Sequence, residues 1–199
     1  MKPADVIVVG GGLAGSTLST VLARQGRSVL VLERETKFKD RVRGESMLPW
    51  GVAAARRLRV FDDLVAAGAH RDQWVPSPSK PGLALIGDAA AATDPSWGCG
   101  LSKTLVDVEN LSARLGETTD WNAGLQRYAA EHNDYYGKLH NILSWMTELV
   151  WSGGPAADER RSRVFPRLQA DPTGFPDPTG QGPFGPCDEQ ARRLILGET

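Results

Sequence analysis

The 199-residue chain lacks several features that define whole classes of protein. It has only 2 cysteines, Cys99 and Cys187, which are too few for a disulfide framework. It has 23 basic and 24 acidic residues and no long basic cluster, which disfavours nucleic acid as a partner. Its apolar runs are short and interrupted by Gly or Asp, so none is long enough to predict a membrane span.

The amino terminus also lacks the charged region, apolar region and cleavage site of a signal peptide. Together with the free cysteines, this predicts a cytoplasmic location. His132 and His140 have no third ligand at metal-site spacing, so we expect packing or surface roles and no metal. The length allows one domain with a real core but is short for a two-domain flavin or nicotinamide enzyme.

Residues 5–33 have the pattern of a dinucleotide-binding βαβ unit. The branched apolar run at 6–9 predicts a strand buried on both faces of a parallel sheet. A helix with apolar residues at helical spacing follows and ends at Gln25-Gly26. Residues 28–32 then predict the second strand.

Three glycines between the first strand and the helix have G-x-G-x-x-G spacing. Gly10 permits a tight turn, Gly12 lets the backbone approach a pyrophosphate, and Gly15 lets the helix pack closely on the strand. The pyrophosphate would lie at the helix N-terminus. Glu33 ends the second strand, where it is placed to accept hydrogen bonds from a ribose. The pattern favours a bound dinucleotide over a structural turn, but it does not separate FAD from NAD.

The stretch before residue 81 carries weaker signals. Residues 37–43 are charged and predict an exposed loop. Ser46 is a candidate cap for a helix with Pro49 in its first turn. Residues 61–67 predict a short helix, and the polar, proline-rich segment 70–80 predicts a linker or junction.

A second site-like stretch begins at residue 83. Residues 83–86 predict a third buried strand, which leads into Gly87-Asp88. An acid at the carboxyl end of a parallel strand indicates the crevice where α/β sheets bind ligands. Cys99 lies between two glycines before a helix expected over 101–115, so backbone N–H groups and a positive helix end would face one place. The alternative is that Asp88 only caps a helix-entry turn.

The remaining chain predicts mainly structural elements. Residues 121–150 form one long amphipathic pattern, expected to be a helix that braces the sheet. A short charged helix is expected over 156–164. Residues 166–186 hold six prolines and four glycines, which predicts an extended or disordered tail. Residues 188–196 predict a last helical turn or two.

With these residues in view, the chain resembles the FAD-dependent monooxygenases of the para-hydroxybenzoate hydroxylase type. The glycine fingerprint with Glu33 is similar to the family's site for the ADP half of FAD. The run Arg43-Gly44-Glu45-Ser46 resembles the loop where a family arginine reaches the flavin. Gly87-Asp88, followed by residues 94–102, resembles the family's GD motif, whose aspartate holds the ribityl chain and whose proline and glycines lie against the isoalloxazine.

The resemblance implies FAD as the cofactor, NAD(P)H as a transient reductant, and a set of binding residues. The implied FAD contacts are Gly10, Gly12, Leu13, Ala14, Gly15, Glu33, Arg34, Arg43, Asp88, Pro95, Gly98, Cys99, Gly100 and Leu101. No residue suggests a catalytic acid or base, and Cys99 without a resolving thiol is expected to be a small loop residue.

The implied fold class is α/β: a reduced Rossmann-like FAD-binding fold of the glutathione reductase type. It would have a short parallel sheet, a long bracing helix and an irregular tail. Residues 1–150 would form the FAD-binding domain, assembled from family segments 1–74 and 82–150 with a junction near 74–81. Residues 151–199 would form a short helix and the Pro/Gly-rich tail.

The resemblance omits the middle of the family's sequence. No Asp-Gly pair occurs in the chain, so the family's DG motif is missing, and no alternating strands replace the substrate sheet. Family chemistry is flavin reduction by a nicotinamide and oxygen transfer through a flavin C4a-hydroperoxide to a small organic substrate. We expect FAD binding without coupled hydroxylation. The competing hypothesis is a non-catalytic nucleotide-binding or interaction module derived from a decayed flavoprotein, for which an uncovered sheet would promote self-association. An NAD-linked enzyme is disfavoured because it gives Gly87-Asp88 no role.

Overall fold

The computed structural model describes residues 3–37, 49–59 and 73–198. The chain is mixed α/β, with a short parallel sheet and several helices. It divides into two compact units, Met1–Asn133 and Asp134–Thr199. The border falls inside the long helix α4 (Trp121–Val150), which therefore contributes to both units.

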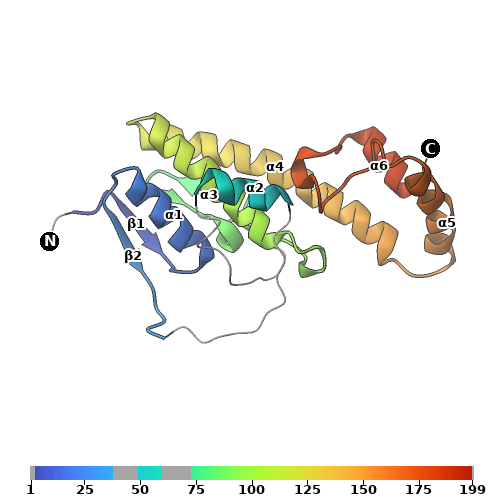
Figure 1. The fold of residues 1–199 in the computed structure, drawn as a ribbon, viewed down its shortest axis with the longest axis horizontal. Coiled ribbons are helices and arrows are strands. Elements are labelled where there is room, and N and C mark those ends of the chain that lie inside the picture. Colours follow the sequence, from blue (N-terminus) through green and yellow to red (C-terminus); the bar gives the residue numbers. More distant parts are fainter. Residues whose placement is uncertain (1–2, 38–48, 60–72, 199) are drawn as a thin grey trace. The chain divides into compact units, whose positions relative to one another are not determined.

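The predicted βαβ unit forms at the start of the first unit. Strands β1 (Val6–Val9) and β2 (Val29–Leu32) pair in parallel, and α1 (Leu13–Arg24) connects them and lies against one face of the pair (Figure 1). Leu18 and Leu22 of α1 are buried. This burial of an amphipathic stripe is what fixes α1 on the sheet.

The prediction that β1 is buried on both faces was wrong. Val8 is 7% exposed, whereas Ile7 is 59% and Val9 is 84% exposed. The paired residues Leu30 and Leu32 share their face and are also exposed. A short branched apolar run has the same sequence whether one or two faces are covered, so its pattern could not distinguish the two cases.

The prediction of a third parallel strand over 83–86 was also wrong. Strand β5 (Leu83–Ala84) pairs antiparallel with β4 (Ser79–Lys80), and Leu83 is 52% exposed. Strand β3 (Gln73–Trp74) pairs antiparallel with β6 (Ala91–Ala92). Within the described residues, the parallel sheet has only β1 and β2. The sequence signal was the Pro81-Gly82 pair, because Gly82 has φ +73° and reverses the chain between β4 and β5.

Helices α2 (Pro49–Arg57) and α3 (Gly100–Glu117) pack closely together. The α3 range confirms the helix expected over 101–115. A Cβ added to Gly51 would lie 2.5 Å from Cα of Ser102, so the crossing requires glycine at this position. The Ser46 cap and the helix predicted over 61–67 lie outside the described residues.

The predicted range of α4 is confirmed, but its first half packs on a different element. The Tyr128 hydroxyl donates to the Leu85 carbonyl at 2.7 Å, and Asn133 Nδ2 donates to the Pro76 carbonyl at 2.8 Å. The Ser79 hydroxyl donates to the Leu125 carbonyl at 3.0 Å. In the first unit, α4 thus holds the antiparallel segment 76–85.

The second unit has its own apolar core. Helices α5 (Pro155–Ala170) and α6 (Glu189–Leu196) follow the second half of α4. Arg161 Nη1 donates to the carbonyls of Leu149 at 3.1 Å and Ser152 at 2.8 Å, which caps the C-terminal end of α4. The core residues are Leu149, Val164, Phe175, Ile195 and Leu196.

The prediction that residues 166–186 are extended or disordered was wrong. The charged helix continues through Pro166 to Ala170, and Phe175 is only 6% exposed within the core. The Asp177 carboxylate accepts from the backbone N–H groups of Thr179 and Gly180, which forms a defined turn. The high proline and glycine content predicted disorder because composition does not show that a single aromatic residue, Phe175, packs into the core.

We predict that Gly51→Ala destabilises the first unit by about 1–3 kcal/mol, because the new methyl group overlaps the Ser102 backbone. The free energy of urea unfolding measures this. Gly137→Ala is the matched control: a Cβ there meets no atom within 4 Å, and alanine in a helix should add about 0.5–1 kcal/mol. Equal effects of the two substitutions would contradict the close crossing.

Candidate dinucleotide-binding site

The glycine loop between β1 and α1 has the backbone geometry that its sequence requires. Gly10 has φ +100°, a conformation that favours glycine. A Cβ at Gly15 would lie 1.9 Å from the Gly10 carbonyl oxygen, so helix and strand approach too closely for any side chain. A Cβ at Gly12 would meet no atom within 4 Å. The loop is therefore tightly packed between Gly10 and Gly15, whereas the space beside Gly12 contains no protein atoms.

Glu33 is tied to this loop at the end of β2. One carboxylate oxygen accepts from the Gly11 N–H at 2.6 Å and the other from the Glu35 N–H at 2.8 Å. These hydrogen bonds, first that of Glu35 and then that of Gly11, hold the pKa of the Glu33 carboxyl below its usual range. The carboxylate is exposed and keeps lone pairs for further donors such as ribose hydroxyls. The neighbouring Arg34 side chain is 92% exposed.

The Gly87-Asp88 turn lies directly against the start of α1. Gly87 has φ +60°, and a Cβ there would lie 3.1 Å from Cβ of Ala14 and 3.3 Å from Oγ1 of Thr104. The fold thus brings together two sequence blocks that are more than seventy residues apart. Asp88 lies in the 3-10 turn η1 (Gly87–Ala89) and is exposed at this junction.

A second tight loop leads from this turn into α3. The Asp94 carboxylate accepts from the Ser96 N–H at 2.7 Å, which caps the 3-10 turn η2 (Pro95–Trp97). Gly98 follows in the left-handed region with φ +65°. Gly100 and Leu101 begin α3 and are half-buried.

Cys99 precedes α3 as a buried residue of this loop. Its side chain is fully buried, and Sγ donates to the Trp97 carbonyl at 3.5 Å. Burial raises the pKa of the Cys99 thiol to about 12. The thiol is therefore protonated at neutral pH, as expected of a packing residue.

A buried polar network lies behind the Gly87-Asp88 turn. Asp107 of α3 accepts from the Gly87 N–H at 2.9 Å through one carboxylate oxygen. The other carboxylate oxygen, Oδ1, lies 2.7 Å from Nδ1 of His132. Lys103 Nζ lies 3.7 Å from Oδ2, the oxygen that accepts from Gly87. All three side chains are fully buried. His132 is thus a packing histidine, as expected, while the sequence analysis missed Lys103 and Asp107.

The signal for this network was present in the sequence. Lys103 and Asp107 are four residues apart, which places both on one face of a helix. Burial lowers the pKa of Lys103, whereas the Asp107 and Asp88 carboxylates act to raise it. Asp107 therefore links the buried Lys103 side chain of α3 to the turn that carries Asp88.

Several predicted features need separate mention. Arg43 and the run to Ser46 lie outside the described residues. No cluster of three metal-ligating side chains occurs within residues 3–37, 49–59 and 73–198. Among the helices described there, none is long and apolar enough to cross a bilayer.

We predict that Asp107→Asn costs about 3–5 kcal/mol of stability, because it leaves buried Lys103 and the Gly87 turn without their carboxylate. Urea unfolding measures the loss. Asp134→Asn is the control, since this exposed partner of Lys138 should contribute no more than about 1 kcal/mol. If Asp107→Asn behaves like the control, Asp107 does not hold the turn.

We predict that iodoacetamide at pH 8 modifies Cys187 but not Cys99 in the folded protein, because so little Cys99 thiolate exists there. Peptide mass spectrometry before and after unfolding measures both sites. Unfolding should make them equally reactive. Rapid modification of Cys99 in the native state would show an accessible, reactive thiol instead.

Comparison with known proteins identifies the first block. Residues 3–75 match the family model of the FAD binding domain. The chain is 38% identical over 94 residues to squalene epoxidase of Schizosaccharomyces pombe, covering 40% of this chain and 20% of that protein. It is 44% identical over 66 residues to squalene monooxygenase of Rattus norvegicus, covering 33% and 12%. With squalene epoxidase of Gibberella zeae it shares 54% identity over 55 residues, covering 28% and 11%.

The chain thus spans no more than 20% of the length of these relatives. The matched region includes the glycine loop, Glu33 and α2. The predicted resemblance and the predicted cofactor are confirmed. Residues 3–75 thus match an FAD binding domain, the chain is similar to a part of squalene monooxygenases, and FAD is its cofactor.

Proposed function

We propose that this chain holds FAD as a reduced glutathione-reductase-type Rossmann unit and acts as an NAD(P)H-dependent flavin oxidoreductase. The observation that supports this proposal is the close approach of Gly87 to Ala14 of α1, with the exposed Asp88 next to Gly87 in the chain. A dinucleotide needs its pyrophosphate and its ribityl chain held by neighbouring elements. In this proposal the glycine loop holds the pyrophosphate and the Asp88 turn holds the ribityl chain.

In this proposal the glycine loop from Gly10 to Gly15 holds the pyrophosphate at the start of α1. Glu33 accepts hydrogen bonds from the adenosine ribose, and Asp88 accepts them from the ribityl chain. The residues proposed to lie against the isoalloxazine are Pro95, Gly98, Gly100 and Leu101, whereas Cys99, which the family resemblance also implied, has no exposed surface to contact a ring. The N–H groups at the start of α3 stabilise negative charge on the reduced ring. Bound FAD supplies the redox chemistry.

The substrate side is less complete than in the relatives. Two of them are named for the epoxidation of squalene, an apolar substrate, and the chain spans no more than 20% of their length. We propose that any organic substrate of this chain is apolar, and that the chain alone does not exclude water from the reduced flavin. It therefore consumes NAD(P)H without coupled oxygen transfer. The cytoplasmic location and the domain boundaries near 74–81 and 150 stay predictions.

We predict that the purified chain binds FAD and that Gly12→Ala weakens this binding at least tenfold with little change in the thermal midpoint. The added methyl group meets no protein atom, so it would obstruct only the ligand. Flavin fluorescence quenching measures affinity, and thermal unfolding is the control. Unchanged FAD affinity would place the pyrophosphate elsewhere.

The same preparation tests coupling. With squalene present, NAD(P)H consumption should yield peroxide and no oxygenated product, measured by oxygen uptake and mass spectrometry. Tight coupling to a product would contradict the proposed uncoupled reaction. Absence of NAD(P)H oxidation by FAD-loaded protein would contradict the oxidoreductase activity itself.

A second candidate function is a non-catalytic interaction module. The exposed apolar side chains on one face of the β1-β2 pair favour it, because such a face promotes association. These side chains are Ile7, Val9, Leu30 and Leu32. Colourless protein that does not take up added FAD but self-associates in analytical ultracentrifugation would support this candidate over the first.

A further inference from the structure

Lys103 occupies a position that is unfavourable for a cation in two respects. It is the fourth residue of α3, at the end of the helix where the helix dipole already places positive charge. Its side chain is also fully buried, so the ammonium group has lost its contact with water. A lysine in such a place requires negative charge nearby, and the carboxylates that supply this charge indicate its role.

The first of these carboxylates belongs to Asp107, one helical turn further along α3. Lys103 Nζ lies 3.7 Å from Asp107 Oδ2, and both side chains are fully buried. The same oxygen accepts from the Gly87 N–H at 2.9 Å, and Oδ1 lies 2.7 Å from Nδ1 of His132. Asp107 therefore divides its negative charge among groups on three different elements, and Lys103 receives only a part of it.

The second carboxylate belongs to Asp88. Asp88 is exposed and follows Gly87, whose N–H donates to the same Asp107 oxygen that Lys103 faces. Burial lowers the pKa of Lys103, and the carboxylates of Asp107 and Asp88 both oppose this shift. Lys103 therefore lies within electrostatic reach of two acids, one inside the protein and one at the proposed flavin site.

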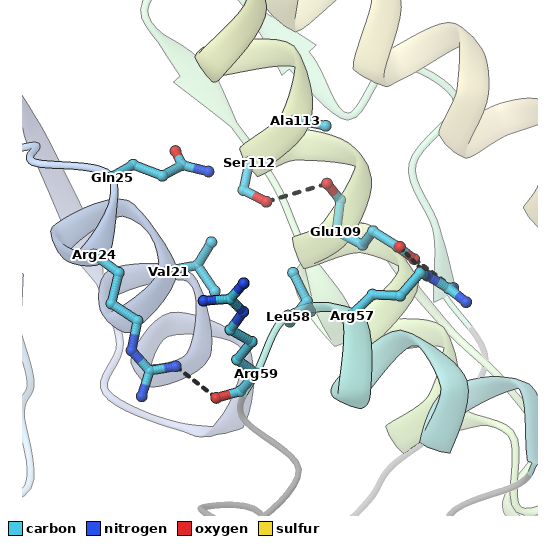
Figure 2. A pocket seen from close by; sticks show the side chains of 9 residues that line it. All are labelled: Val21, Arg24, Gln25, Arg57, Leu58, Arg59, Glu109, Ser112 and Ala113. Atoms are coloured by element: carbon cyan, nitrogen blue, oxygen red, sulfur yellow. Dashed lines mark hydrogen bonds and ion pairs between the residues drawn. The ribbon is translucent and has the colours of Figure 1, made fainter.

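The next acid along α3, Glu109, is engaged on another side of the helix. It lies two residues past Asp107, which at 3.6 residues per turn places it about 200° further around the helix. Its Oε2 accepts from Arg57 Nη2 at 2.8 Å, and its Oε1 accepts from Nε of the same guanidinium. Figure 2 shows this pair beside the pocket between the C-terminal ends of α1 and α2 and the second half of α3. Glu109 is therefore paired with α2 and not with Lys103.

Ligand binding at the proposed site changes the surroundings of Asp88 but not those of Asp107. In the free protein Asp88 is in contact with water, whereas Asp107 is already buried. A ribityl chain that covers Asp88 removes this water from the carboxylate. Burying a carboxylate is costly unless an opposite charge lies close to it. A cation that is already buried behind the turn offsets this cost without losing water of its own.

We propose that Lys103 is a positioning residue of the FAD site, which supplies the counter-charge for Asp88 when the flavin half of FAD covers that carboxylate. This inference rests on the proposed function, because it takes the Asp88 turn as the site of the ribityl chain. The glycine loop and Glu33 bind the ADP half separately. Lys103 therefore strengthens the binding of FAD but not the binding of ADP.

The test compares two probes, FAD and ADP, each titrated into the full chain by calorimetry. Lys103→Met should weaken FAD binding at least tenfold and change ADP binding less than twofold. A merely structural role of Lys103 would weaken both probes alike, because the glycine loop and the Asp88 turn belong to one unit. Equal weakening of both probes, or unchanged FAD binding, would overturn the proposal.

A second variant is included because Lys103→Met removes the cation beside a buried carboxylate and destabilises the fold. The double variant Lys103→Met/Asp107→Asn removes both charges, and the oxygen of the new amide can still accept from the Gly87 N–H. It should bind ADP like the natural chain and FAD at least tenfold more weakly. Natural FAD affinity in this variant would also overturn the proposal, because the site would then need no counter-charge.

A double-mutant cycle tests whether Lys103 acts through Asp88. Asp88→Asn should itself weaken FAD binding, because the neutral amide is a weaker acceptor for ribityl hydroxyl groups. In the Asp88→Asn background, Lys103→Met should weaken FAD binding less than twofold further, since a neutral side chain needs no counter-charge. A further tenfold loss would show that Lys103 acts on the ligand by another route.

Lys138→Met is the matched control for the loss of a lysine charge. Lys138 Nζ lies 2.6 Å from Asp134 Oδ2 at the same four-residue spacing on a helix, but this pair is exposed. The control should bind both probes like the natural chain, and weakened FAD binding there would contradict a specific role of Lys103. A natural chain that binds ADP but not FAD would contradict the proposed flavin function, and this inference with it.

Discussion

The close approach of the Gly87 turn to the first residues of α1 is the constraint on which the site depends. A Cβ at Gly87 would lie 3.1 Å from the Ala14 side chain, and Asp107 accepts the Gly87 N–H from inside α3. These contacts hold the glycine loop, the Asp88 turn and the start of α3 as one surface. We propose this surface as the dinucleotide site, because the helix N-termini of α1 and α3 both begin there and a helix N-terminus favours phosphate and other anions.

The stability of this surface comes from buried polar groups as well as apolar packing. Asp107 contacts the turn, His132 of α4 and Lys103 of its own helix, all without solvent exposure. A carboxylate in such a place is tolerated only when its hydrogen bonds and charge are matched. Helix α4 therefore contributes to the site through His132, although the helix itself is distant in sequence from every predicted FAD contact.

The short parallel sheet has a different consequence. Helix α1 packs against one face of β1 and β2, so Ile7 and Val9 are exposed on the opposite face, which a second layer of helices would cover. The matched segment makes up 20% of the length of the squalene epoxidase of Schizosaccharomyces pombe. The small number of elements around this sheet also supports the proposed uncoupled chemistry, because excluding water from a flavin requires protein on both sides of it.

The sequence by itself determined the βαβ unit, the glycine geometry and the long helices. Each depends on contacts between residues close in the chain: the positive φ of Gly10, the packing of Gly15 and the periodicity of α4. Tertiary structure decided the rest. The exposure of Ile7, the antiparallel pairing of Leu83 and the packed position of Phe175 depend on which distant elements cover a surface. The pocket lined by Val21, Leu58 and Glu109 forms where the C-terminal ends of α1 and α2 meet the second half of α3, and no local pattern specifies such a meeting.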